Sequence, residues 1–318
     1  MKVLITGGAG FIGANLVRRL ETMAGIAEIV VIDDLSFGFR ENLDDTSATL
    51  LEGSILDEQL LRHATDGAST IVHLAARSSV PRSVAEPMAT HEVNATGTAL
   101  VLEAARRAGD VQVIVASSSS VYGSTDVLPK HEGLAARPIS PYAASKLATE
   151  SYALAWGHSY GLPVLALRLF NVFGPLQPPA HTYAAVIPAF LAAACSDRPL
   201  PVYGDGTQCR DFTFVGSVVD VLGQAITRRV NYPDPVNLAF GTRVTLLEVV
   251  AELEHILERR LPVDHMPTRV GDVHRSQADS SLLLELFPDL EPTELADGLR
   301  ATVEWFERAR PWERPASV

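Results

Sequence analysis

The chain has 318 residues, of which 47% are hydrophobic and 20% charged, and its formal net charge is −12 at pH 7. This balance is typical of a globular protein with a large core, and the acidic charge argues against nucleic acid or an anionic membrane surface as a partner. No apolar run reaches the roughly 18 residues of a membrane span, and the two cysteines, Cys195 and Cys209, match no zinc or redox spacing, which favours a reducing compartment.

Strands and helices alternate along the first half of the chain. The opening MKVLITGG enters a strand and a glycine turn rather than a signal peptide, so we expect a cytoplasmic protein. Apolar runs predict strands at residues 2–7, 27–35, 48–55, 69–76, 111–118 and 163–172, and helical spacing predicts helices at 11–23, 56–65, 88–109 and 141–161. This alternation predicts a doubly wound Rossmann-type α/β fold, in which a parallel sheet is covered on both faces.

The pattern changes after residue 172. A proline-rich loop at 173–183 precedes a predicted helix at 184–196, short strands at 200–206, 209–215 and 236–241, and a helix at 245–259. We interpret these segments as a smaller, discontinuous α/β domain that binds the substrate. The larger domain would comprise residues 1–171 plus about 212–243, and the smaller one residues 172–211 and about 244–318.

A glycine turn joins the first strand to the first helix. TGGAGFIG contains Gly7, Gly10 and Gly13, which let the backbone approach a phosphate at the helix N-terminus. An ordinary tight turn is the alternative. Asp33 and Asp34 end the second strand about 20 residues later, where a carboxylate accepts a hydrogen bond from an adenosine ribose and repels a 2′-phosphate. The pattern therefore favours NAD over NADP.

Tyr142 and Lys146 lie one turn apart on one face of a predicted helix. A free phenol has a pKa of about 10, and a nearby ammonium and a positive nicotinamide ring would favour its ionised form. Four serines at 117–120 end a predicted strand, where ligands bind in open α/β sheets, so one of them can share the proton that the phenol takes. The alternatives are an exposed Tyr–Lys pair and a serine-rich turn with backbone caps.

Together these blocks resemble the extended short-chain dehydrogenase/reductase family, and within it the UDP-sugar 4-epimerases. The matching blocks, in the family's order, are TGGAGFIG, VIDDLS, HLAA, SSSSVYG, SPYAASK, LRLFNVFGP, GDGTQCRDFTFV and RVGDVHRSQAD. The resemblance implies that Tyr142 is the catalytic base, that Lys146 lowers its pKa, and that Ser118 is the catalytic serine. It also implies a homodimer, and it implies no metal.

The resemblance further assigns the residues that contact NAD and the UDP-sugar. One of them, Ser54, departs from the family, which often has an acid there. The implied NAD contacts are Gly7, Gly10, Phe11, Ile12, Gly13, Asp33, Asp34, Ser36, Ser54, Ile55, Leu74, Ala75, Ala76, Asn94, Ser117, Tyr142, Lys146 and Phe170. The implied sugar-nucleotide contacts are Arg77, Ser78, Arg82, Ser118, Ser119, Tyr142, Asn171, Val186, Tyr203, Gln208, Arg210, Arg269, Asp272 and Ser276, with Asn171, Arg210 and Arg269 on the diphosphate.

The implied reaction is reversible oxidation of a UDP-sugar at C4, in which the Tyr142 phenolate takes the hydroxyl proton and the 4-keto sugar turns over before it is reduced. Related 4,6-dehydratases carry an Asp–Glu pair before VYG and decarboxylases a Glu, whereas this chain has Ser119 and Ser120, which cannot serve as carboxylic acids. Asp33 disfavours an NADPH reductase. A catalytically silent NAD-sensing regulator is disfavoured because Ser118, Tyr142 and Lys146 are all present.

The identity of the sugar depends on a few pocket positions. Ser276 matches the residue that gates the pocket in the family, and a small residue there admits bulky sugars. Arg77 and Arg82 could bind a C6 carboxylate, which favours UDP-glucuronate and UDP-galacturonate slightly over UDP-N-acetylhexosamines, with UDP-glucose third. Against the uronate, the GPLQPP loop lacks an arginine found in some uronate epimerases, and both arginines could instead face solvent or pair with protein acids.

Overall fold

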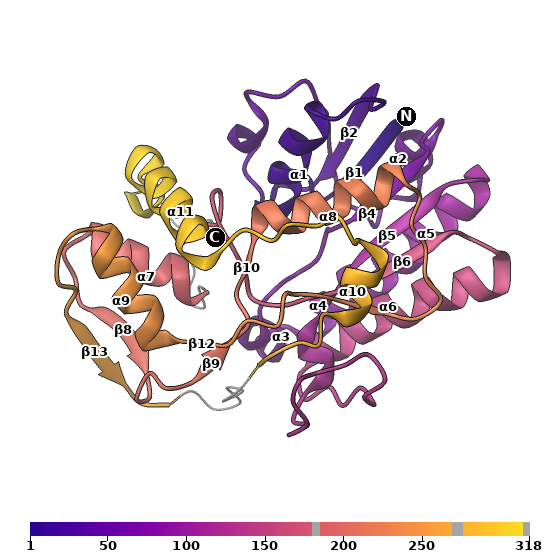
Figure 1. The fold of residues 1–318 in the computed structure, drawn as a ribbon. Coiled ribbons are helices and arrows are strands. Elements are labelled where there is room, and N and C mark those ends of the chain that lie inside the picture. Colours follow the sequence, from indigo (N-terminus) through magenta and orange to yellow (C-terminus); the bar gives the residue numbers. More distant parts are fainter. Residues whose placement is uncertain (180–184, 269–275, 314–318) are drawn as a thin grey trace.

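Seven parallel strands form the main sheet of the computed structural model, which describes residues 1–179, 185–268 and 276–313 (Figure 1). The strands are buried along most of their length because helices cover both faces. Across the sheet they follow the order β11 (Val236–Leu238), β6 (Val164–Leu169), β5 (Gln112–Ser118), β4 (Thr70–His73), β1 (Lys2–Thr6), β2 (Glu28–Asp33) and β3 (Thr49–Glu52). This order confirms the predicted doubly wound fold, and the direction of winding reverses between β1 and β4.

Two groups of helices cover the sheet. On one face α1 (Phe11–Glu21) and α8 (Val215–Thr227) pack together, and on the other α2 (Glu58–Thr65), α5 (Gly97–Ala108) and α6 (Pro141–Tyr160) do so. Short helical segments connect the strands near the carboxyl edge: η1 (Arg40–Leu43), α3 (Val80–Ala85), α4 (Pro87–His91), the π-helical η2 (Glu92–Thr96) and η3 (Ser119–Tyr122). No helix of the described residues is long and apolar enough to cross a membrane.

The smaller domain lies beside the main sheet, at the left of Figure 1, and has its own apolar core. Its larger elements are α7 (Val186–Cys195), β8 (Leu200–Tyr203), α9 (Leu246–Ile256), β13 (Val263–Met266) and α11 (Leu295–Ala309), followed by η4 (Pro311–Glu313). In the described residues β8 pairs with β13, and β9 (Cys209–Arg210) pairs with β12 (Val244–Thr245). A further pairing, of β7 (Val172–Phe173) with β10 (Thr213–Phe214), joins residues from the two predicted domains.

One segment of the predicted smaller domain packs on the main sheet. Helix α10 (Ser281–Leu286) lies in the range assigned to the smaller domain, but it packs against β11, and Leu283, Phe287 and Leu290 are buried in the core with α1 and α8. Burial of these apolar side chains over the edge strand holds α10 in this place. The predicted domain boundaries remain a prediction.

Candidate active site

The glycine turn is tightly packed against its neighbours. Gly7 has a φ of +73°, and a Cβ on it would lie 2.6 Å from the backbone nitrogen of Ala75. A Cβ on Gly13 would lie only 2.3 Å from the carbonyl oxygen of Gly7. Gly10 is the N-cap of α1 and has no side chain, so the first N–H groups of the helix carry no side-chain cap. Side chains at these glycine positions would fill the space beside the helix N-terminus. With glycine there, that space fits the diphosphate of a dinucleotide.

We expect Gly13→Ala to weaken NAD binding by about 10-fold or more, because the added methyl must push α1 away from the turn. Calorimetric titration of the variant with NAD measures the effect. Gly133→Ala is the matched control, because Gly133 is exposed and its nearest neighbour is the His131 side chain at 3.3 Å. Equal affinities in the wild type and Gly13→Ala would contradict this role for the turn.

Asp33 joins the end of β2 to the glycine turn. Its Oδ2 accepts a hydrogen bond from the backbone N–H of Ala9, and its Oδ1 accepts one from the N–H of Leu35, both at 2.9 Å. Burial raises the pKa of the Asp33 carboxyl, and the hydrogen bonds from Leu35 and Ala9 oppose that rise. The predicted ribose-binding carboxylate therefore lies directly beside the glycine turn.

Asn94 fixes the loop that follows β4. Its Oδ1 accepts a hydrogen bond from the N–H of Arg77 at 2.7 Å, and its Nδ2 donates to the carbonyl of Arg77 at 3.1 Å and to Ser145 Oγ at 2.9 Å. Asn94 lies in the π-helical η2, a deviation that is frequent at functional sites. The predicted NAD contact is thus a buried amide that ties the loop of Leu74, Ala75 and Ala76 to α6.

Ser118 and Tyr142 meet at the carboxyl edge of the sheet. Ser118 ends β5, and its side chain lies close enough to the Tyr142 phenol to influence the pKa of that group. Helix α6 begins just before Tyr142, because Ser140 Oγ caps the N–H of Ala143 at 3.1 Å and Pro141 occupies the first turn. Burial raises the pKa of the Tyr142 phenol, and the hydrogen bond with Ser118 opposes that rise.

Lys146 follows one turn later on α6 and is buried. Desolvation lowers the pKa of its ammonium to about 8, so the group keeps most of its charge at neutral pH. Nearby His73 is different: burial, followed by the charge of Lys146, lowers its pKa to about 3. Its two ring nitrogens lie 2.7 Å from Thr6 Oγ1 and 3.0 Å from Thr98 Oγ1, so we interpret His73 as a neutral link between strands and helices.

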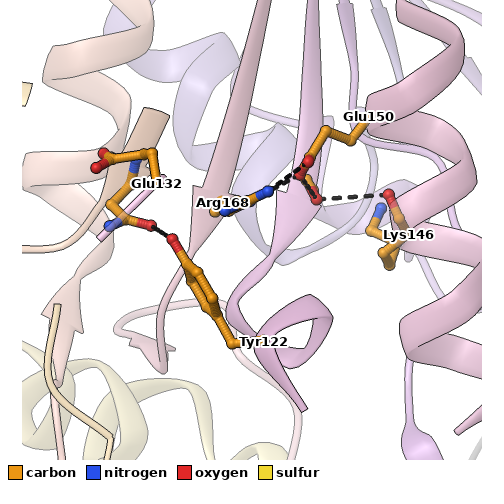
Figure 2. Close-up of polar contacts among 7 residues, drawn as sticks. Tyr122, Glu132, Lys146, Glu150 and Arg168 are labelled. Atoms are coloured by element: carbon orange, nitrogen blue, oxygen red, sulfur yellow. Dashed lines mark hydrogen bonds and ion pairs between the residues drawn. The ribbon is translucent and has the colours of Figure 1, made fainter. Parts of the chain in front are cut away.

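A buried network of polar side chains lies behind Tyr142 and Lys146, and it was not predicted from the sequence (Figure 2). Glu150, one turn beyond Lys146 on α6, forms an ion pair with Arg168 of β6, and Figure 2 shows Arg168 between Glu150 and the ring of Tyr122. Burial works to lower the pKa of Arg168, but the hydrogen bond and charge of Glu150 outweigh it and raise that pKa. The one sequence signal was a charged residue inside the apolar run PVLALRLFNV.

Asp211 organises the substrate side of the site and was also not predicted. It is fully buried, and its Oδ2 and Oδ1 accept hydrogen bonds from the N–H of Ala278 and from Thr242 Oγ1, both at 2.9 Å. Burial raises the pKa of the Asp211 carboxyl, and these hydrogen bonds oppose that rise. The carbonyl of Asp211 accepts a hydrogen bond from Asn171 Nδ2 at 3.0 Å. Three chain segments therefore converge beside the predicted diphosphate residue Asn171.

Arg210 and Ser276 come together in the same region. The N–H of Ser276 donates to the carbonyl of Cys209 at 3.2 Å, next to Arg210 in β9. Two further predicted substrate residues, Arg269 and Asp272, lie outside the described residues. The role of Arg269 as the second arginine on the diphosphate therefore remains a prediction.

The two arginines considered for a sugar carboxylate both have protein partners. Arg77 forms an ion pair with Glu86, and the guanidinium of Arg82 lies 4.1 Å from the centre of the Phe37 ring. A C6 carboxylate would have to compete with Glu86 for Arg77. The observation that favoured the uronate from the sequence is therefore weaker in the structure.

The other predicted site residues fall into two groups. Phe11, Ile12, Asp34, Ser36, Ser54, Ile55, Ser78, Ser117, Ser119 and Phe170 lie on the turns, loops and element ends of the larger domain, and Val186, Tyr203 and Gln208 lie in the smaller one. Within the smaller domain Gln208 Nε2 donates to the carbonyl of Tyr203 at 2.5 Å. Asn171 and Asp211 link the two groups.

Comparison with known proteins adds independent information. A family model described as the NAD dependent epimerase/dehydratase family matches residues 3–239. UDP-glucose 4-epimerase of Mycolicibacterium smegmatis is 35% identical over 312 residues, covering 96% of this chain and 98% of that protein. dTDP-glucose 4,6-dehydratase of Streptomyces niveus is 32% identical over 325 residues, covering 99% and 95%. The solved UDP-N-acetylglucosamine 4-epimerase from Methanobrevibacter ruminantium M1, in complex with UDP-N-acetylmuramic acid, has a TM-score of 0.91 at 35% identity, covering 97% of this chain and 98% of that one.

Proposed function

The chain belongs to the NAD-dependent epimerase/dehydratase family, and on that premise we propose that it is an isomerase that inverts C4 of a UDP-sugar. The observation that carries this proposal is the meeting of Ser118, at the end of β5, with Tyr142 at the start of α6, with the buried ammonium of Lys146 one turn along the same helix. The pair lies at the carboxyl edge of the sheet, where ligands bind in folds of this kind.

The residues present fit NAD as the cofactor. The glycine turn would hold its diphosphate and Asp33 its adenosine ribose, and bound NAD would supply the group that reversibly oxidises C4. Tyr142 takes the proton of the sugar 4-hydroxyl and later returns it, while the neighbouring Ser118 hydroxyl helps to share that proton. The positive charge of Lys146 stabilises the Tyr142 phenolate. Arg210 and Asn171 hold the diphosphate while the sugar turns over.

A dehydratase is the second candidate, since the dehydratase of Streptomyces niveus is a relative of similar identity. Dehydration needs a carboxylic acid and a carboxylate base beside the sugar to move a proton from C5 and to release water. At the positions where the resemblance puts them, this chain has Ser119 and Ser120, and Ser120 Oγ donates to Ser118 Oγ at 2.9 Å. We therefore favour epimerisation.

Among the sugars we place the UDP-N-acetylhexosamines first, ahead of the uronates. The ion pair of Arg77 with Glu86 weakens the main argument for a C6 carboxylate, and the similar structure from Methanobrevibacter ruminantium is a UDP-N-acetylglucosamine 4-epimerase. Ser276 supports the same choice, because a small side chain leaves room for an N-acetyl group. The homodimer that the family resemblance implies stays a prediction.

We expect the purified protein to convert UDP-N-acetylglucosamine into its C4 epimer faster than it converts UDP-glucuronate or UDP-glucose. Each substrate is supplied separately, and proton NMR follows the appearance of the C4-inverted sugar. A faster reaction with UDP-glucuronate would restore the uronate as the substrate. A 4-keto-6-deoxy product in place of an epimer would identify a dehydratase, and no reaction with any of the three would contradict the proposed function.

A further inference from the structure

We propose that Ser117 and the buried Glu150–Arg168 ion pair are positioning residues that hold the end of β5, with Ser118, against the helix that carries Tyr142 and Lys146. The catalytic value of this positioning rests on the proposed function, but the structural coupling itself does not. None of the three side chains is used in the chemistry derived above. All three are buried, with 3% of each residue's surface exposed.

Ser117 joins the ion pair to the catalytic strand. Its Oγ donates to Glu150 Oε2 at 2.9 Å and lies 3.4 Å from the carbonyl oxygen of Lys146. It precedes Ser118 in the chain, so its hydroxyl points into α6 just where β5 ends. This side chain was assigned to NAD from the resemblance, but its hydrogen bond is made to the protein.

Arg168 joins the same carboxylate to the neighbouring strand. Its Nε donates to Glu150 Oε2 at 2.9 Å and its Nη2 to Oε1 at 2.6 Å, a two-pronged arrangement that fixes direction as well as distance. Arg168 also lies directly opposite Ser117 in the parallel pairing of β5 and β6. One carboxylate on α6 therefore binds two adjacent strands at the level of the catalytic serine.

The far side of Arg168 is anchored as well. Its guanidinium carbon lies 4.7 Å from the centre of the Tyr122 ring, and the Tyr122 hydroxyl donates to Asn237 Oδ1 at 2.6 Å (Figure 2). Asn237 Nδ2 in turn donates to the carbonyl of Lys130 at 2.9 Å. Since both ends of the ion pair are fixed, Glu150 gives Ser117 a rigid acceptor rather than a mobile one.

Ser117→Ala tests this arrangement, because it removes one hydroxyl and leaves the ion pair in place. We expect kcat for C4 epimerisation to fall by about 10- to 100-fold while KM for the UDP-sugar and the bound NAD content stay unchanged, since misplaced reacting groups slow the chemical step. Hydrogen exchange of the wild-type and variant holoenzymes, read by mass spectrometry, should also become faster over residues 117–122 and 142–150.

Ser217→Ala is the matched control. Ser217 is a buried serine of α8 whose Oγ accepts a hydrogen bond from the N–H of Thr293 at 2.9 Å, outside the candidate site. It should lose comparable thermal stability but keep kcat and the exchange rates of those two segments. The exchange measurement needs no substrate, so it tests the coupling even if the wild type epimerises none of the UDP-sugars. Absence of epimerisation by the wild type would contradict the proposed function but not the coupling.

Three results would overturn the inference. One is exchange in Ser117→Ala that is no faster over residues 117–122 and 142–150 than in Ser217→Ala. A second is a kcat equal to that of an active wild type. The third is loss of bound NAD from Ser117→Ala, which would return this hydroxyl to the cofactor contacts implied by the resemblance.

Discussion

Replacing Tyr142 with phenylalanine is expected to slow C4 epimerisation by about 10²- to 10⁴-fold, the usual range for loss of a positioned general base. The substitution keeps the ring and removes only the hydroxyl that lies beside Ser118. Two nearby titratable groups of the described residues cannot take its place, because Lys146 keeps most of its charge at neutral pH and His73 is engaged by its two threonine contacts. The rate is followed by NMR with the UDP-sugar that the wild type converts fastest.

Tyr152→Phe is the control for this experiment. Tyr152 lies on the same helix, 40% exposed, and its ring packs edge-on against Trp156, a contact that phenylalanine preserves. This variant should react at the wild-type rate. If Tyr142→Phe turned over as fast as Tyr152→Phe, the phenol could not be the group that exchanges the C4 hydroxyl proton.

Glu150→Ala is expected to lower the free energy of unfolding by about 3–5 kcal/mol, because it leaves the guanidinium of Arg168 buried without its counter-charge. Both side chains of this ion pair are only 4% exposed. One further guanidinium nitrogen, Nη1, already lacks a hydrogen-bond partner among the described residues, so the environment offers little compensation. Urea unfolding of the variant and the wild type measures the difference.

Two comparisons separate this effect from a general loss of charge. Glu103→Ala removes a carboxylate that pairs with Arg106 and Arg107 on the surface of α5, and it should change stability little. The double variant Glu150→Leu with Arg168→Met removes both charges and should be more stable than Glu150→Ala. A Glu150→Ala protein as stable as Glu103→Ala would contradict the view that the buried charge is the cause.

Features encoded by neighbouring residues could be predicted from the sequence. The glycine turn between a strand and a helix, Asp33 at the end of the next strand, and Tyr142 and Lys146 one turn apart each depend on local spacing, and the structure places Asp33 at the turn and Tyr142 beside Ser118. Parallel sheets bring the ends of their strands to one edge, so even the meeting of Ser118 with α6 follows from the fold class.

The contacts that escaped prediction depend on residues far apart in the chain. Glu150 reaches Arg168 only because β5 and β6 pair with Ser117 opposite Arg168, a register that no local pattern specifies. The same holds for Asp211 and Ala278, which lie 67 residues apart in the chain and meet only in the folded protein, and for α10, whose apolar face could have covered either core. Arg77 is a prediction that the structure weakens. Its place after HLAA suggested that it binds a sugar carboxylate, but in the structure its charge is compensated by Glu86.

The central claim is that one sugar carbon is oxidised and then reduced again at the same site. A UDP-sugar that carries deuterium at C4 tests it most directly, since the hydrogen removed from C4 should return to C4 of the epimer without exchange with solvent. We predict that the C4 epimer formed in ordinary water retains the deuterium at C4, as read by NMR and mass spectrometry. An epimer that has lost the label to solvent, or a product that carries it at another carbon, would contradict the account.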